Sequence, residues 1–254
     1  AFFLGHGNPM ITLTQNAYTA AWTRLGQHYE HPKAILCISA HWYVDGLYIT
    51  GSSNPTTIHD FHGFPDALTK LEYSAPGQPE LAQSIAGLLK DWGASMDDEW
   101  GFDHGAWTIL RHLYPRADIP VLQLSLDKSK APEWHFNLGK TLSALREEGI
   151  LIIGSGNVVH NLSLYDWNSP DRPAYDWAER FENRVSDWVR NRDFVPLIHY
   201  EKSGLDAMRA IPTPEHYLPL LTVLGTITDD DHISFPIQGS EGGSISMLSI
   251  QIGG

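Results

Sequence analysis

The fold of this chain is decided by the stretch Ala34-Ile35-Leu36-Cys37-Ile38-Ser39-Ala40-His41-Trp42. Its first five residues are all apolar, whereas a strand with one face in water would alternate between apolar and polar residues. Continuous hydrophobicity of this kind is typical of a strand that is covered on both faces of a parallel sheet. The stretch then ends in a histidine, His41, where such a strand leaves the core.

Three further short runs have the same apolar character, and helical patterns lie between them. The runs cover residues 2–4, 119–124 and 150–153. Apolar residues recur at helical spacing at Leu81, Ile85, Leu88, Leu89 and Trp92, at Leu138, Leu142 and Leu145, and at Trp177, Phe181, Val185 and Val189. Strands that alternate with amphipathic helices predict the α/β class, with a mostly parallel or mixed central sheet and helices on both faces. No repeat or linker interrupts the pattern, so we expect residues 1–254 to form a single domain.

The end of the chain predicts one more helix and one more strand. Thr213 suits the N-cap of a helix and Pro214 its first position, and the apolar run over residues 217–224 continues that helix. Residues 244–252 alternate well enough for a final strand. Residues 51–79 are rich in Pro, Gly, Asn and Thr, so we expect a long loop over the sheet.

The composition restricts the partners of the protein. The chain carries 17 Lys+Arg against 30 Asp+Glu, for a net charge of −13. It therefore lacks the basic footprint that a nucleic acid or an anionic membrane requires, and no apolar stretch is long enough to span a bilayer. Its single cysteine, Cys37, lies in an apolar run and no signal peptide precedes the first strand, so we expect a cytoplasmic protein. The sequence leaves the oligomeric state open.

Three of the 13 histidines fall at the carboxyl ends of predicted strands, where open α/β sheets bind their ligands. His6 follows the first strand, His41 ends the second, and His160 lies a few residues beyond the run 150–153. One histidine at such a position is commonly a hydrogen-bonded structural residue. Three at equivalent positions of one sheet indicate a shared site, and histidine is the commonest metal ligand.

His216 and Glu215 compete to complete this set. Two histidines and one carboxylate are the usual ligands of non-haem Fe(II), which favours Glu215. An acidic residue in the first turn of a helix is, however, already explained by the helix dipole, whereas a histidine there is not. We therefore expect His216 to be the ligand, and Glu215 remains the alternative.

Other histidines lie in stretches that could reach the same edge of the sheet. His104 precedes a predicted short helix in a segment rich in glycine and aromatic residues, so it is either a site residue or a packed histidine bonded to the backbone. His59 and His62 lie in the long loop and are candidates for the wall of a substrate pocket.

Five motifs contain or adjoin these candidate residues. They are Phe3-Leu4-Gly5-His6-Gly7-Asn8-Pro9-Met10, Ser39-Ala40-His41-Trp42, Trp100-Gly101-Phe102-Asp103-His104-Gly105, Ser155-Gly156-Asn157-Val158-Val159-His160-Asn161 and Thr213-Pro214-Glu215-His216-Tyr217-Leu218-Pro219. Together these motifs closely resemble the DOPA-dioxygenase branch of the class III extradiol ring-cleavage dioxygenases. The resemblance spans residues 3–252. It implies a single α/β domain and Fe(II)-dependent opening of a catechol ring by O₂, next to the hydroxyls. It also implies His6 and His41 as metal ligands, His160 as the acid/base and His104 as its helper near the substrate.

This chain departs from the wider class at the third ligand. The better-known members use a glutamate, whereas this branch presents Glu215-His216. A site of three histidines, with His160 near enough to be a fourth ligand, also suits Zn²⁺, which often binds more tightly than Fe²⁺. The expected cofactor is therefore Fe(II) for dioxygenase activity, with Zn²⁺ as a second ion that the site suits.

The chemistry of ring cleavage accounts for these residues. Three protein ligands on an octahedral ion leave two positions for a chelating catecholate and one for O₂. A catechol must lose protons to chelate, and we expect His160 to be the base. We expect the aromatic side chains of Trp42, Trp107 and Tyr217 to bind the flat ring. Two other functions stay open: a zinc hydrolase, in which the metal activates water, and a non-catalytic binding protein on the same scaffold.

Overall fold

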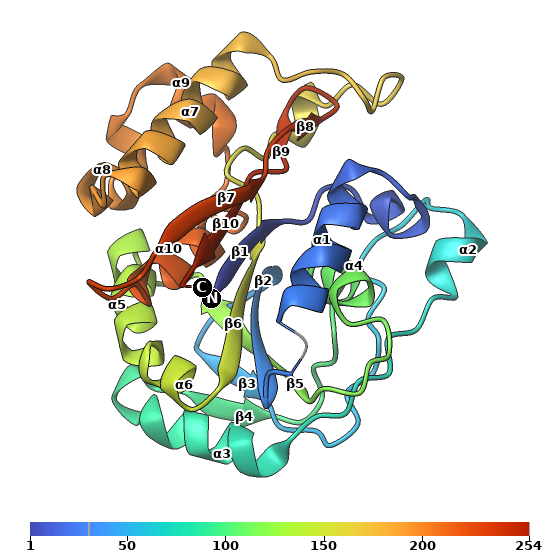
Figure 1. The fold of residues 1–254 in the computed structure, drawn as a ribbon, viewed down its shortest axis with the longest axis vertical. Helices are drawn as coiled ribbons and strands as arrows, with labels where there is room; N and C mark the ends of the chain where they lie inside the picture. Colours follow the sequence, from blue (N-terminus) through green and yellow to red (C-terminus); the bar gives the residue numbers. More distant parts are fainter. Residues whose placement is uncertain (30, 254) are drawn as a thin grey trace.

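An eight-stranded sheet organises the chain in a computed structural model, which describes residues 1–29 and 31–253 (Figure 1). The strand order is β4-β3-β5-β2-β6-β1-β10-β7. The strands are β1 (Phe2–Gly5), β2 (Ala34–Val44), β3 (Tyr48–Thr50), β4 (Ser95–Asp97), β5 (Val121–Asp127), β6 (Ile150–Gly156), β7 (Ile233–Ile237) and β10 (Ser249–Ile252). The central strands β5, β2, β6 and β1 run parallel, and β10 and β7 add an antiparallel edge. The predicted α/β class with a mixed, mostly parallel sheet is confirmed.

Helices cover both faces of this sheet, because neighbouring residues of β2 pack into two different cores. Ile35 and Cys37 belong to a core shared with α1 (Ala17–His28) and α4 (His104–Leu113). Leu36 and Ile38 belong to the other core, which contains residues of α3 (Pro79–Leu88), α5 (Pro132–Leu142), α7 (Asp176–Arg190) and α10 (Leu218–Gly225). Figure 1 shows α1 and α4 on one side of the sheet and α5 and α10 on the other. Successive side chains of a strand point to opposite faces, so a strand covered twice has to be apolar throughout.

The smaller elements lie between these helices and strands. The short helices are α2 (Asp66–Thr69), α6 (Ala144–Glu147), α8 (Phe194–Ile198) and α9 (Leu205–Ala210), and the 3₁₀ turns are η1 (Pro9–Leu13), η2 (Lys90–Trp92), η3 (Leu162–Leu164) and η4 (Tyr200–Lys202). A hairpin pairs β8 (Ser240–Glu241) with β9 (Ile245–Ser246). The predicted strand over residues 244–252 is thus divided into β9 and β10. In the described part of the chain, no helix is both long and apolar enough to cross a membrane.

The predicted start of the C-terminal helix is wrong. Helix α10 begins at Leu218, not at Pro214, and carries Pro219 in its first turn. In a helix that began at Pro214, Pro219 would lie in the interior, where its ring has no N–H to donate and clashes with the preceding turn. The residues before α10 instead form a turn, in which the N–H groups of Tyr217 and Leu218 both donate to the carbonyl of Pro214, at 2.9 and 3.0 Å. The hydroxyl of Thr213 donates to Glu215 (2.7 Å) and does not cap the helix.

Candidate metal centre and its cavity

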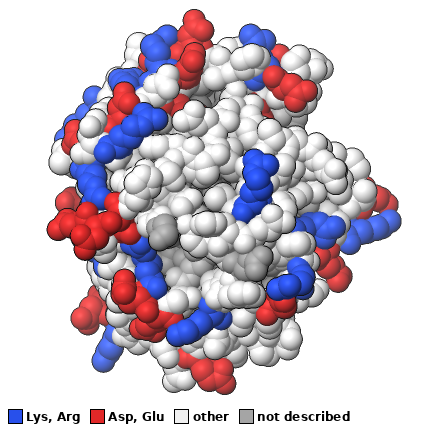
Figure 2. Space-filling model, in the orientation of Figure 1, with Lys and Arg blue, Asp and Glu red and all other residues white. Residues whose placement is uncertain are grey.

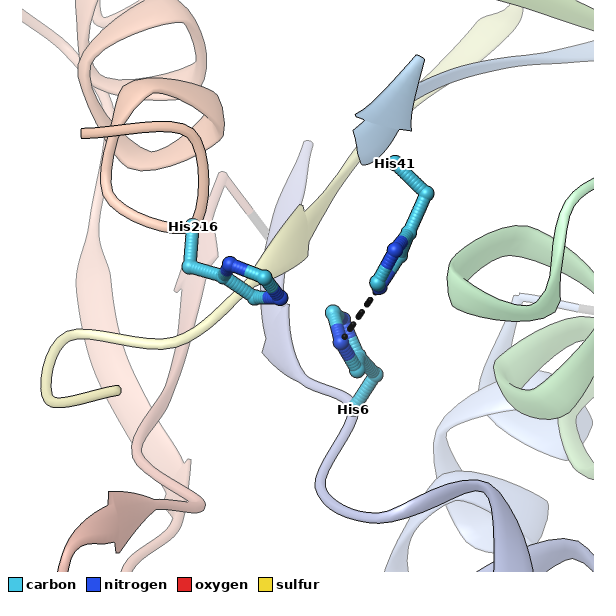
Figure 3. A group of neighbouring side chains, drawn as sticks. All are labelled: His6, His41 and His216. Carbon is cyan, nitrogen blue, oxygen red and sulfur yellow. Dashed lines mark hydrogen bonds between the residues drawn. The ribbon is translucent and has the colours of Figure 1, made fainter. Parts of the chain in front are cut away.

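Three histidines, of which His6 and His216 are buried and His41 is half-buried, meet at the carboxyl edge of the parallel strands (Figure 3). His6 follows β1 directly, His41 stands inside β2, and His216 lies in the turn before α10. One ring nitrogen of each histidine lies within 4.8 Å of a ring nitrogen of each of the other two. The Nε2 atoms of His6 and His41 are 3.2 Å apart. Side chains from three distant parts of the sequence therefore share one small space.

Strand register brings the first two histidines together. Ser155 of β6 is the direct neighbour of both Leu4 in β1 and Ser39 in β2. Residues two positions apart on a strand point to the same face, so His6 follows Leu4 and His41 follows Ser39 on that face. Both imidazoles consequently project beside β6, on the side of the sheet that α4 covers.

The turn that carries His216 reaches the site because β6 ends in a glycine. A Cβ atom on Gly156 would lie only 2.2 Å from the carbonyl oxygen of His216. The N–H of Asn157 donates to the same carbonyl at 2.8 Å. A side chain at position 156 would push this turn away from the strand edge, so the glycine is required for the approach of His216.

The Nδ1 atom of His6 forms a hydrogen bond with a hydroxyl group. It lies 3.0 Å from Oγ of Ser155, and that hydroxyl donates its own hydrogen to the carbonyl of Gly105 at 2.6 Å. The hydroxyl can therefore only accept from His6, which places the ring hydrogen on Nδ1. The Nε2 atom of His6 is left with a lone pair that faces His41.

Carboxylates contact the Nδ1 atoms of the other two histidine rings. Nδ1 of His41 lies 3.3 Å from Oδ2 of Asp60, and Nδ1 of His216 lies 3.2 Å from Oε1 of Glu215. Burial alone would raise the pKa of Asp60, but its hydrogen bonds with His104 lower the pKa to about 2. Its ionised oxygen can only accept, so the hydrogen of His41 lies on Nδ1. Nε2 of His216 is buried and has no hydrogen-bond partner among the described residues.

Converging Nε2 lone pairs of this kind suit a divalent metal ion. Two nitrogen ligands at about 2.1 Å from one ion lie roughly 3.0–3.4 Å apart at octahedral or tetrahedral angles, which matches the His6–His41 separation. Burial first, and neighbouring histidines second, lower the pKa values of His6, His41 and His216 well below the usual range. Neutral imidazole is the form that binds metals. The residues present therefore fit a metal site.

Asp60 also connects this group to His104. Oδ1 of Asp60 accepts the backbone N–H of His104 at 2.9 Å, and Oδ2 lies 2.9 Å from Nδ1 of the same residue. His104 is the first residue of α4, and a Cβ on Gly105 would lie 2.5 Å from Oγ of Ser39 and 2.8 Å from His41. The start of α4 can approach β2 this closely only because Gly105 has no side chain.

Asp60 is absent from the residues that the sequence predicts for the site. It lies between His59 and His62, which were expected to be candidates for the pocket wall. His59 instead donates from Nε2 to the carbonyl of Leu71 (2.9 Å), and His62 is exposed. The signal that the sequence offers is an acidic residue in a loop that passes over the carboxyl edge of the sheet.

A cavity of about 260 Å³ opens onto these histidines. His6, His41, His104, His160 and His216 line it together with Asp60. Its apolar wall is made of Phe61, Phe64, Leu162, Trp167 and Ile245. A larger hollow, of about 510 Å³, lies at the amino edge of the strands and contains none of these residues. The smaller cavity has the aromatic wall and the polar groups that a flat aromatic ligand requires.

Comparison with known proteins decides the family. The model of the catalytic LigB subunit of aromatic ring-opening dioxygenase matches residues 6–243. The chain belongs to the extradiol ring-opening dioxygenases. It is similar to 4,5-DOPA dioxygenase extradiol from Escherichia coli (strain K12), with 48% identity over 258 residues, which cover 100% of this chain and 94% of the relative. The protein of the same name from Beta vulgaris is 36% identical, with 96% of this chain and 93% of the relative covered.

A solved structure agrees with this assignment. An uncharacterised protein from Escherichia coli K12 superimposes with a TM-score of 0.86 at 43% identity, and the match covers 100% of this chain and 98% of that one. The family that the sequence motifs indicate is confirmed. As an extradiol dioxygenase the chain is an oxidoreductase, and its family implies a catechol-type aromatic substrate and O₂. The cluster of histidines and Asp60 is consistent with a metal site in such an enzyme.

His160 stands in the cavity of the dioxygenase but stacks against His216. The two ring centroids are 3.4 Å apart and the planes differ by 5°. The backbone N–H of His160 donates to the carbonyl of Ala210 at 2.8 Å. Burial first, and His104 second, lower the pKa of His160 to about 4, so its ring is neutral near pH 7. A neutral histidine on the cavity wall offers a ring-nitrogen lone pair to a hydroxyl group in the cavity.

The three aromatic residues expected to bind the substrate ring do not line the cavity of the dioxygenase. Trp42 is stacked on Trp100 at 5.1 Å, Trp107 donates from Nε1 to the carbonyl of Ile58 (2.9 Å), and the hydroxyl of Tyr217 donates to the carbonyl of Leu197 (3.2 Å). The reason is clearest at Trp42, because neighbours on a strand point to opposite faces and His41 faces the site. The aromatic wall comes instead from Phe61, Phe64 and Trp167.

Proposed function

We propose that this dioxygenase cleaves the ring of a DOPA-type catechol between carbons 4 and 5, with Fe(II) held by His6, His41 and His216. The observation that carries the proposal is the convergence of one ring nitrogen from each of these three histidines at the aromatic cavity. The printed names of the relatives from Escherichia coli and Beta vulgaris support DOPA as the substrate. We further propose that residues 1–254 act as one catalytic domain.

The metal and the protein contribute different parts of the reaction. When bound, Fe(II) supplies Lewis acidity toward the catechol oxygens and redox reactivity toward O₂, whereas Zn²⁺ would supply only the first. The cavity wall holds the ring flat through Phe61, Phe64 and Trp167 and keeps water away from it. Zn²⁺ therefore fits the site as an ion that binds but does not support turnover.

The proton transfers fall to the remaining histidines of the cavity. A catechol loses its hydroxyl protons as it chelates, and we assign their removal to His160, which is neutral and lines the cavity. A ligand atom of His160 lies within 4.8 Å of ligand atoms of Glu215 and His216, but His160 is not in the group formed by His6, His41 and His216. This placement supports an acid/base function of His160 rather than a role as fourth ligand. His104 donates its Nδ1 hydrogen to Asp60, so its Nε2 is left to accept a hydrogen bond from substrate.

Reconstitution under anaerobic conditions tests the function. Metal-free protein is loaded with Fe(II) or with Zn²⁺, and O₂ uptake is recorded with a panel of catechols that includes L-DOPA. We expect uptake and a yellow ring-opened product only with Fe(II), and mass spectrometry should find both atoms of ¹⁸O₂ in the product. Protein that holds Fe(II) but consumes no O₂ with any catechol would contradict the proposal.

We also propose a cytoplasmic location without nucleic-acid or membrane partners. Cys37 is buried and free, as expected in a reducing compartment. On the face shown in Figure 2, Lys and Arg side chains are scattered among Asp and Glu rather than gathered into one basic patch. The net charge of −13 agrees with this distribution.

A further inference from the structure

One carboxylate, that of Asp60, serves two histidines on different elements. It accepts the backbone N–H and Nδ1–H of His104 at the start of α4, both at 2.9 Å. Its Oδ2 atom also lies 3.3 Å from Nδ1 of His41 on β2. The Asp60 side chain is only 20% exposed, so these contacts are partly shielded from water. Asp60 thus joins a proposed metal ligand to a second histidine that faces the substrate.

The position of Asp60 is well defined although it lies in an irregular segment. The N–H of Ile58 donates to the carbonyl of Phe102 and the N–H of Phe102 donates to the carbonyl of Thr56, both at 2.7 Å. The indole of Trp107 donates to the carbonyl of Ile58 at 2.9 Å. A Cβ on Gly101 would lie 1.9 Å from the carbonyl oxygen of Thr56, so the two segments could not approach with any other residue there. The loop is held against the segment that leads into α4.

We propose that Asp60 is a positioning residue that sets the tautomer of His41 and orients His104, and that it does so from outside the coordination sphere of the metal. A carboxylate oxygen accepts hydrogen bonds but cannot donate them when ionised, so it requires the hydrogen of His41 on Nδ1. The lone pair on Nε2 is then directed at the metal position. In sites with two histidines and one carboxylate, the negative charge is itself a ligand. Here it acts through an imidazole.

The other two rings show that this arrangement is particular to Asp60. His6 is backed by the neutral hydroxyl of Ser155. His216 is backed by Glu215, whose oxygen also accepts the hydroxyl of Thr213 and serves no second histidine of the cavity. Loss of the Asp60 carboxylate should therefore disturb a ligand and a substrate-facing histidine together, whereas loss of the Glu215 carboxylate should disturb only His216.

The decisive comparison is between Asp60→Asn and Asp60→Ala. An amide has one oxygen for the three donors that Asp60 now accepts, so its NH₂ group must face either the His104 backbone or a ring nitrogen. Where it faces His41, the amide donates to Nδ1 and moves the ring hydrogen to Nε2, which removes the metal-binding lone pair. Alanine lets water occupy the space and leaves the tautomer free. We expect the affinity for Zn²⁺ or Co²⁺ to fall by about 10- to 100-fold in Asp60→Asn and by less in Asp60→Ala.

The tautomer itself is measured on the metal-free protein, without reference to activity. Long-range ¹H–¹⁵N NMR of the ring nitrogens should show His41 protonated at Nδ1 in the wild type and shifted toward Nε2 in Asp60→Asn. Glu182→Gln is the matched control, because Glu182 is another half-buried carboxylate, its Oε2 accepts the hydroxyl of Ser246 (2.6 Å), and it does not line the cavity. It should leave the tautomers, metal affinity and turnover unchanged.

The outcomes separate this inference from the proposed function on which it rests. A wild type that binds no metal, or binds Fe(II) without ring cleavage, would contradict the function, while the NMR comparison would still test Asp60. Unchanged His41 protonation in both variants, with metal affinity within about twofold of the wild type, would overturn the inference and leave the function intact. Equal losses in Asp60→Asn and Asp60→Ala without a change of tautomer would reduce Asp60 to a packing role and also overturn it.

Discussion

Among the histidines around the candidate metal position, His41 stands in strand β2 and His6 directly follows strand β1, whereas His160 lies in the loop after β6 and His216 in the turn before α10. His41 is a residue of β2, and the N–H of His6 donates to the carbonyl of Gly156 at 3.2 Å, which extends the ladder beyond β1. His160 is held by the hydrogen bond from its N–H to Ala210 and by an isolated bridge to Ile245, and the carbonyl of His216 accepts the N–H of Asn157. Strand register places a side chain through many neighbouring contacts, whereas a turn depends on a few distant ones. We therefore expect the identity of the third ligand and the proton-transfer group to depend on His216 and His160, which lie outside the central strands.

The strand-borne pair should be indispensable for metal binding. We expect His6→Ala or His41→Ala to abolish metal retention, because each removes a lone pair that converges on one point in a buried site. Elemental analysis of the purified variants checks this. His199→Ala changes an exposed histidine away from the cavity and should keep full metal content. Unchanged stoichiometry in either strand variant would place the metal elsewhere.

His160, in the loop after β6, should separate catalysis from metal binding. We expect His160→Gln to keep Fe(II) and to bind catechol, while turnover falls by about two to four orders of magnitude, the usual contribution of a positioned proton-transfer group. The loss should appear in kcat rather than in KM. Metal content and kcat are measured on one preparation. Joint loss of metal and activity, with partial recovery on adding Fe(II), would make His160 a ligand.

His216, in the turn before α10, should prove to be the third ligand in place of its neighbour Glu215. Glu215→Gln retains an oxygen that can accept Nδ1–H of His216, so we expect metal affinity to fall by no more than about tenfold. His216→Ala removes the unpaired Nε2 atom and should release the metal. Competition with a chelator measures both affinities. The reverse order would restore the arrangement of two histidines and one carboxylate.

The smallest effect is expected on the cavity wall, which loops supply. Trp167 is 59% exposed, so its contact with substrate should contribute at most about 1 kcal/mol, or roughly fivefold in affinity. Trp167→Ala should therefore raise KM a few-fold and leave kcat and metal content unchanged. Trp42→Phe is the contrast, because Trp42 is buried against Trp100 and should affect thermal stability instead. A larger KM effect at Trp42 than at Trp167 would contradict the wall that the structure defines.

The local sequence pattern predicts the positions of His6 and His41 well. The run that ends at His41 is apolar on both faces because β2 is covered twice, and His41 falls where that strand meets the edge. His6 follows from the same reasoning. His216 was expected to be a ligand from its place in a helix, yet it lies in a turn that Pro219 keeps out of α10. The structure brings it to the site through Gly156, a contact between distant segments.

The sequence by itself determined the α/β class, the family and the strand ends that carry His6 and His41, because these depend on periodicity and motifs within short segments. Only the tertiary structure decided which aromatic residues face the cavity and that Asp60 joins His41 to His104. Trp42 and Phe61 are equally aromatic in the sequence, and strand direction alone turns the first into the core. Asp60 meets its partners because a loop and a helix start close onto one strand edge. Contacts between segments so far apart in the sequence produce no periodic pattern from which they could be predicted.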